Sequence, residues 1–167
     1  MLSMNLYDAL QQALPQYDIV PLTDANFADI SRVFETNQDF LVEGYGGLID
    51  EKGIFGAISQ LVDDFKPSNK YLAGIYQNGK PIAAIDLLAN SPAKGDLYLS
   101  FLVVRRDLQG QGIGTAISCG IISAAELAGF NQIHLGSFDN TAKFWQNQGY
   151  IRIERHNDFI AFHRSLT

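Results

Sequence analysis

The chain has 167 residues and contains little cysteine and little histidine. One cysteine, Cys119, excludes an internal disulfide and a cysteine-rich zinc site. The three histidines, His134, His156 and His163, are too few and too scattered for a metal cluster, so we expect no bound metal. No run approaches 18 apolar residues, and the start MLSMNLYDALQQAL lacks the basic region and apolar core of a signal peptide. We therefore expect no membrane contact and a reducing, cytoplasmic location.

Positive charge is also scarce. Lys and Arg number 12 against 18 Asp and Glu, which gives a net charge of -6 and a pI near 4.9. Such an acidic chain is a poor non-specific binder of phosphate backbones, so we expect no nucleic-acid partner. The hydrophobic fraction of 47% excludes a disordered chain, and the length favours one domain over residues 1–167.

Hydrophobic spacing and turn signals predict a mixed α/β sheet with helices packed on it. Helices are predicted at 5–14, 54–65, 114–128 and 141–148. Strands are predicted at 17–21, 71–76, 81–88, 96–104, 133–135, 150–154 and 159–164. A further helix follows the N-cap candidates Thr23 and Asp24, and Asn78-Gly79 predicts a hairpin turn. The acidic, glycine-bearing segment 38–53 is expected to be a loop.

The segment with the clearest chemistry is 105–116, RRDLQGQGIGTA. Its glycines follow a predicted strand and open a predicted helix, an arrangement that presents free backbone N–H groups to a diphosphate. A dinucleotide fingerprint fails because Thr115 stands three residues after Gly112, and a P-loop fails because no lysine follows the glycines. The alternative is a turn that only lets the helix pack closely on the strand.

Two motifs resemble those of the GNAT N-acetyltransferases. The run 109–114, QGQGIG, matches the family signature [RQ]-x-x-G-x-[GA]. Asn140 with the run 144–150, FWQNQGY, resembles the second signature, N…[LF]-Y-x-x-x-G-F. The resemblance covers most of the chain and implies a single-domain GNAT fold of the α/β (α+β) class, with a mixed central β-sheet flanked by helices.

The resemblance also implies acetyl-CoA as co-substrate and a set of residues that bind it. The residues expected to hold its pyrophosphate are Gln109, Gly110, Gln111, Gly112, Ile113, Gly114 and Thr115. Where the central strand leaves its neighbour, backbone groups of Leu102 and Val104 would pair with the pantetheine arm, and Val104 would help to polarise the thioester carbonyl. Asn140 and Trp145 are expected to contact the co-substrate from the second signature. The alternative for Asn140 is an N-cap of the short helix.

A base must remove a proton from the acceptor amine before it attacks. By alignment on the glycine loop, Asp96 falls where related enzymes carry a glutamate base, although Asp96 could equally be a turn residue. Asp86 is the rival, because a carboxylate in the apolar run AAIDLL must be paired, ligand-facing or raised in pKa. Trp145 stands where the family has a tyrosine that protonates the thiolate, and an indole is no acid. Tyr98 and Tyr150 are the candidates to protonate the thiolate in its place.

The implied activity is that of an acyltransferase: acetyl transfer to a primary amine by direct attack in a ternary complex. The acceptor is expected to be a small-molecule or peptide amine, and the acidic composition favours a cationic one. A homodimer is a further expected assembly. The alternative function is a GNAT-like acyl-CoA-binding sensor without turnover, which the missing tyrosine would permit. A third interpretation is an unrelated nucleotide-binding α/β protein.

Overall fold

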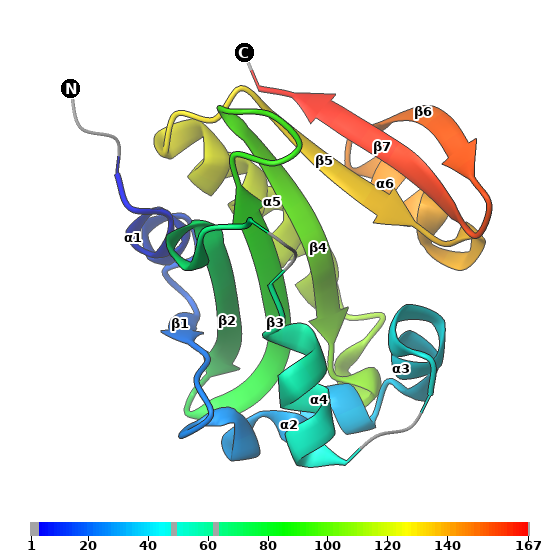
Figure 1. Cartoon of the computed structure of the whole chain (residues 1–167). Coiled ribbons are helices and arrows are strands. Elements are labelled where there is room, and N and C mark those ends of the chain that lie inside the picture. The colour runs from blue at the N-terminus through cyan, green and yellow to red at the C-terminus, as the bar shows by residue number, and fades with distance from the viewer. Residues whose placement is uncertain (1–3, 48–49, 62–63, 167) are drawn as a thin grey trace.

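One seven-stranded sheet organises the chain in this computed structural model, which describes residues 4–47, 50–61 and 64–166 (Figure 1). The strands are β1 (Asp18–Pro21), β2 (Lys70–Gln77), β3 (Lys80–Ala89), β4 (Asp96–Val104), β5 (Gln132–Ser137), β6 (Ile151–His156) and β7 (Phe159–Ser165). Their order is β1-β2-β3-β4-β5-β7-β6; β4 and β5 run parallel, and the other neighbouring pairs of described strands are antiparallel. The predicted mixed α/β sheet is confirmed.

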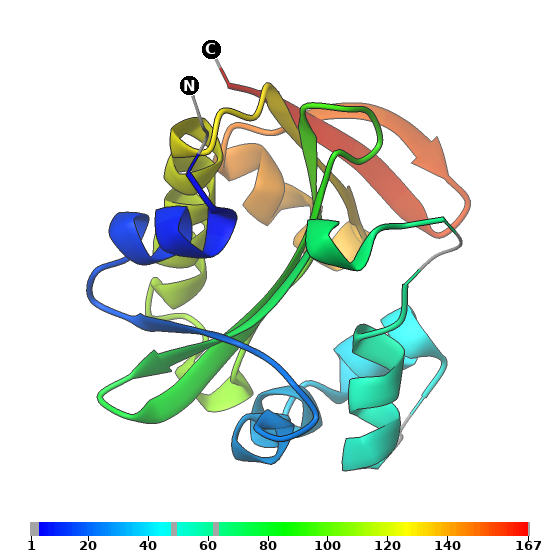
Figure 2. The same ribbon diagram turned by 60° about the vertical axis from the view of Figure 1, so that its left-hand side comes forward.

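Helices cover both faces of the sheet (Figure 2). On one face lie α1 (Leu6–Ala13), α5 (Ile113–Leu127) and α6 (Ala142–Asn147), and on the other α2 (Ser31–Glu35), α3 (Gln38–Tyr45) and α4 (Glu51–Ile58). Two separate hydrophobic cores result, one on each side of the sheet. Each fully buried aliphatic or aromatic side chain in them stabilises the fold by about 1.5–3 kcal/mol.

A β-bulge in the central strand β4 assigns its apolar residues to the two cores. Leu97 and Leu99 pack in the core beneath α5, whereas Phe101 and Val103 pack in the core beneath α2 and α4. Side chains alternate along a regular strand, so these four odd-numbered residues would otherwise share one face. The register with β3 shifts between Asp86 and Leu87, which leaves Ser100 as the extra residue and reverses the alternation.

The hairpin between β2 and β3 forms as predicted. Asn78 and Gly79 both adopt positive φ angles, 53° and 77°, which suit a two-residue turn between antiparallel strands. Short polar or absent side chains make this conformation accessible.

The prediction of a loop over 38–53 is wrong, because this segment contains α3 and the start of α4. Leu41 is fully buried, and Gly46 closes α3 at φ 82°, where its amide bonds back to the Val42 carbonyl at 3.1 Å. Asp50 caps α4 by accepting a hydrogen bond from the Gly53 amide at 2.8 Å. This helix ends at Ile58, short of the predicted 54–65, of which residues 62 and 63 lie outside the described part.

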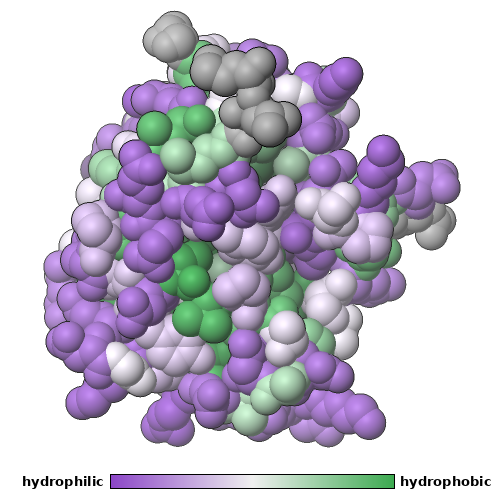
Figure 3. All heavy atoms as spheres, turned by 90° about the vertical axis from the view of Figure 1, so that its left-hand side faces the viewer, coloured by the Kyte–Doolittle hydropathy of each residue, from purple (hydrophilic) through white to green (hydrophobic). Residues whose placement is uncertain are grey.

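The face that carries α1 and β1 is mainly hydrophilic, and hydrophobic residues show there only in small areas (Figure 3). Among the helices that the structure describes, none has the length and apolar character needed to cross a membrane.

We expect opposite effects from the same substitution in two helices. Gly120 of α5 faces α1 so closely that an added Cβ would lie 2.4 Å from the Cγ of buried Leu14. Gly120→Ala should therefore lower the free energy of unfolding by about 1–3 kcal/mol. Gly56 of α4 is exposed with nothing within 4 Å, so Gly56→Ala should raise that free energy by about 0.5–1 kcal/mol. Urea unfolding measures both, and a Gly120→Ala protein as stable as the wild type would contradict the packing described here.

Candidate active site

The site begins where β4 and β5 separate. The two strands pair from Asp96 opposite Gln132 to Leu99 opposite Leu135, and beyond this point no pairing between them continues in the described residues (Figure 1). A cavity of about 600 Å³ lies there, lined by the second half of β4, the end of β5, α3, α6 and the glycine loop. A parallel pair that opens in this way leaves backbone N–H and C=O groups available to a ligand.

The backbone of Leu102 and Val104 faces this opening. The amide of Arg105 donates to the Ile82 carbonyl on β3 at 2.8 Å. In an antiparallel pair successive residues alternate between pointing their polar groups at the partner strand and away from it. Val103 therefore bonds toward β3, while Leu102 and Val104 present their N–H groups toward β5.

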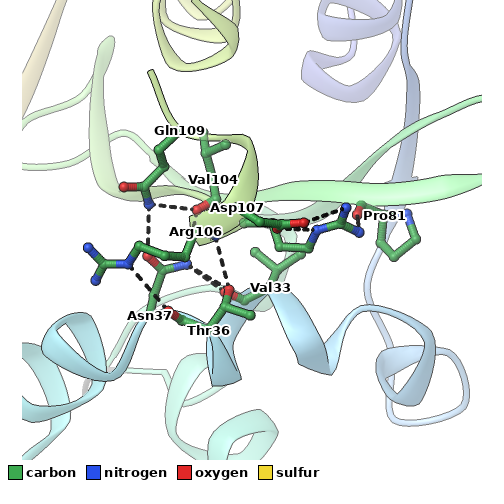
Figure 4. A network of polar contacts seen from close by, with 9 residues as sticks. Val33, Thr36, Asn37, Pro81, Val104, Arg106, Asp107 and Gln109 are labelled. Carbon is green, nitrogen blue, oxygen red and sulfur yellow. Dashed lines mark hydrogen bonds and ion pairs between the residues drawn. The ribbon is translucent and has the colours of Figure 1, made fainter. Parts of the chain in front are cut away.

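The carbonyl of Val104 is already occupied, however. The Nδ2 of Asn37 and the Nε2 of Gln109 both donate to this oxygen at 2.9 Å, and Gln109 also donates to the Oδ1 of Asn37 at 2.9 Å (Figure 4). Asn37 is buried and donates further to the Val33 carbonyl at 2.7 Å. Because a carbonyl oxygen has two lone pairs, Val104 has only its N–H left for a substrate. No motif in the sequence pointed to Asn37.

The two arginines that follow β4 each form an ion pair with an aspartate. Arg105 pairs with Asp107 at 2.7 Å and donates to the Pro81 carbonyl at 3.2 Å, and its guanidinium lowers the pKa of Asp107. Arg106 pairs with Asp39 of α3. The amide of Arg106 donates to Thr36 Oγ1 at 3.1 Å (Figure 4). Both positive charges therefore have acidic partners beside the cavity.

The glycine loop presents a row of unbonded N–H groups. The amide of Gln109 donates to Arg106 and that of Ala116 donates to Gly112, but the six amides between them have no acceptor within the described residues. Gly112 is the N-cap of α5 at φ 86° and supplies no capping side chain. The positive end of the helix dipole adds to these donors. The row, 110–115, suits a diphosphate.

Asp96 lies away from the cavity, at the far end of β4. Its carboxyl is buried, with Oδ2 3.0 Å from His134 Nε2 and accepting a hydrogen bond from Gln132 Nε2 at 3.2 Å. At about 3.4 Å per residue, Asp96 is about 20 Å from Leu102 along the strand. Its assignment as the base stays a prediction, and its contacts are those of a structural residue. Asp86 lies in the middle of β3, opposite Phe101.

The second signature brings Asn140 and Trp145 to the cavity wall. Trp145 packs edge-to-face against Phe144 and Tyr150, with ring centroids 4.8 Å and 5.5 Å apart. Thr141, not Asn140, is the N-cap of α6. Burial raises the pKa of Tyr150 and of Tyr98, and neither lines the cavity within the described residues. No tyrosine there takes the place of the acid.

The comparison with protein families identifies a domain. A family model described as "Acetyltransferase (GNAT) domain" matches residues 53–163. This range includes β2 to β6, most of β7, the glycine loop and the second signature. Among curated proteins no sequence matches the chain.

Solved structures of acetyltransferases share the fold. An acetyltransferase from Thermus thermophilus superposes with a TM-score of 0.73 at 23% identity, over 90% of this chain and 97% of that one. The GNAT domain of PAT from S. lividans gives 0.66 at 14% identity, over 89% of each chain. The PaiA N-acetyltransferase from Thermoplasma acidophilum, solved in complex with coenzyme A, gives 0.60 at 13% identity, over 89% and 98%. At these identities the likeness shows the fold alone.

The two glutamines of the loop should differ in their effect on CoA binding. Gln109→Ala removes the side chain that joins Val104 to Asn37, whereas the side chain of Gln111 makes no hydrogen bond within the described residues. Gln109→Ala should reduce the free energy of CoA binding by about 1.4 kcal/mol, which raises the Kd about tenfold. The Kd of Gln111→Ala should stay within about twofold of the wild-type value. Isothermal titration calorimetry measures both. Equal effects would contradict a positioning role for Gln109.

Proposed function

The chain belongs to the GNAT acetyltransferase family, and on this basis we propose that it transfers the acetyl group of acetyl-CoA to a primary amine. The observation that carries the proposal is the row of six unbonded amides at 110–115, which lies beside the cavity between β4 and β5. Such a row binds the diphosphate of a CoA ester without any lysine. The co-substrate would supply the activated acetyl thioester.

The residues that line the opening between β4 and β5 beyond Leu99, which we call the wedge, have separate tasks in this proposal. The amides of the glycine loop hold the diphosphate, and the N–H and C=O of Leu102 pair with the pantetheine amides. The free N–H of Val104 is a fixed donor near the acyl group, where charge develops in the transition state. Bringing amine and thioester together in one cavity removes much of the entropic barrier to the reaction.

The charge around the cavity favours a cationic acceptor, a small-molecule or peptide amine. Glu43 of α3 lines the cavity, and Glu43 and Asp158 line an adjoining hollow. Neither has an ion-pair partner within the described residues, whereas Asp39 and Asp139 on the same walls are paired with Arg106 and Arg155. The carboxylates of Glu43 and Asp158 attract an ammonium group and add to the general acidity of the chain.

One observation supports the alternative function, a sensor that binds acyl-CoA without turnover. Trp145 replaces the tyrosine of the second signature, and no tyrosine lines the cavity in the described part of the chain. A thiol has a pKa near ~8.5, however, so the thiolate is a tolerable leaving group without a strong acid. We therefore propose acetyl transfer, rather than sensing without turnover, as the function.

The test combines a binding assay with a turnover assay. CoA and acetyl-CoA should raise the melting temperature, whereas NAD and ATP should not. Acetyl-CoA with a panel of primary amines should release free thiol in an amine-dependent way. Gly112→Val is the control, because a β-branched residue is strained at φ 86° and should abolish the CoA-induced shift. Tight CoA binding with no release above background across the panel would favour the sensor, and stabilisation by NAD or ATP instead would overturn both functions.

A further inference from the structure

A buried carboxylate with one free oxygen lies next to the cavity wall. Asp86 is only 3% exposed, and its Oδ2 pairs with the Nζ of Lys70 at 2.6 Å. Its Oδ1 has no hydrogen-bond partner within the described residues. Because a buried acceptor without a donor is costly, native structures rarely keep one without a reason.

The β-bulge of β4 places a cavity-lining serine next to Asp86 in the register of the sheet. Asp86 is opposite Phe101, Leu87 is opposite Leu99, and the extra residue Ser100 lies between them. Ser100 is exposed and lines the cavity. The register places Ser100 beside Asp86 across the two strands, and its hydroxyl lowers the pKa of that carboxyl. Ser100 therefore lines the cavity and is the neighbour of Asp86 on β4.

The groups around Asp86 set its proton affinity. Burial is the largest influence and raises its pKa, whereas Lys70 on β2 and Ser100 on β4 lower it. Burial, with a smaller contribution from the charge of Asp86, raises the pKa of Tyr45 on α3 to about 12. Burial, then Tyr71, and to a lesser extent Asp86 raise the pKa of Tyr7 on α1, so both phenols stay neutral. Asp86 is thus a carboxylate that binds a proton more readily than an exposed one.

We propose that Asp86 accepts the proton of the acceptor amine through the hydroxyl of Ser100, an inference that rests on the proposed function. The ammonium gives one proton to the Ser100 oxygen while the Ser100 proton passes to Oδ1 of Asp86. The neutral nitrogen then bonds to the acetyl carbonyl carbon, and the C–S bond breaks. The second proton, lost as the amide forms, goes to the thiolate. Asp86 later releases its proton to water.

Their positions relative to the cavity favour Asp86 over Asp96 as the base. Asp86 is separated from the cavity by one side chain, whereas Asp96 is hydrogen-bonded at the opposite end of β4 and has no contact with the cavity. A base must come within hydrogen-bond reach of the proton, directly or through one relay.

The experiment measures kcat against pH with an amine that supports thiol release. Asp86→Asn should lower kcat by about 100-fold or more while the CoA-induced melting shift remains. Ser100→Ala should lower kcat less, and should move the acidic limb of the profile to higher pH. The sign follows because the hydroxyl stabilises the carboxylate: without it the pKa of Asp86 rises, and ionisation needs a higher pH. Lys70→Met should move the limb in the same direction.

Matched variants decide the outcome. Ser137→Ala removes the other serine of the cavity wall, whose hydroxyl bonds to Thr141 and the Phe138 carbonyl, and should leave the acidic limb in place. If Asp86→Asn does not fold, the exposed Ser100 still provides the test. A wild-type limb in Ser100→Ala, or loss of the limb in Asp96→Asn alone, would overturn the inference. A wild-type enzyme with no amine-dependent release would instead overturn the proposed function.

Discussion

One extra residue in β4 governs both the cores and the cavity. The bulge at Ser100 reverses which side of the sheet receives the following side chains, so that Phe101 and Val103 pack beneath α2 and α4. β4 also stops pairing with β5 just before this point, after Leu99. A bulge bends its strand and increases the local twist, and this accounts for the separation of two otherwise parallel neighbours. The wedge is thus a consequence of register, not of any side chain that lines it.

The end of β4 needs a second constraint to keep the wedge open. Without partners, the Val104 carbonyl would be a free acceptor inside the protein, and closure onto β5 would satisfy it. Asn37 and Gln109 satisfy it instead, each at 2.9 Å. Each such bond contributes about 0.5–1.5 kcal/mol. The same two side chains join the start of α3 to the glycine loop, so these two walls of the cavity share one fixed point.

Features with local causes could be predicted from the sequence. The turn at Asn78-Gly79 and the loop with Gly110 and Gly112 depend on positive φ angles that few other residues adopt, and both were found where predicted. The bulge at Ser100 and the role of Asn37 depend on contacts with β3 and with β4, which no local pattern reveals. α3 was missed because its acidic residues and the pair Gly46-Gly47 suggested a loop, although a glycine such as Gly46 is also typical of a helix end.

The acidity of the chain is compatible with the proposed anionic co-substrate because of where the charges lie. Arg105 and Arg106 are neutralised by Asp107 and Asp39, so neutral amides, rather than net positive charge, would carry diphosphate binding. The buried pair of Lys70 and Asp86 follows the same principle, because it is neutral before the reaction. Moving a proton from an ammonium group to Asp86 shifts one positive charge from the cavity to that pair and leaves the local total unchanged. A low-dielectric site tolerates such an exchange far better than the creation of a new charge, since isolated charges are costly there.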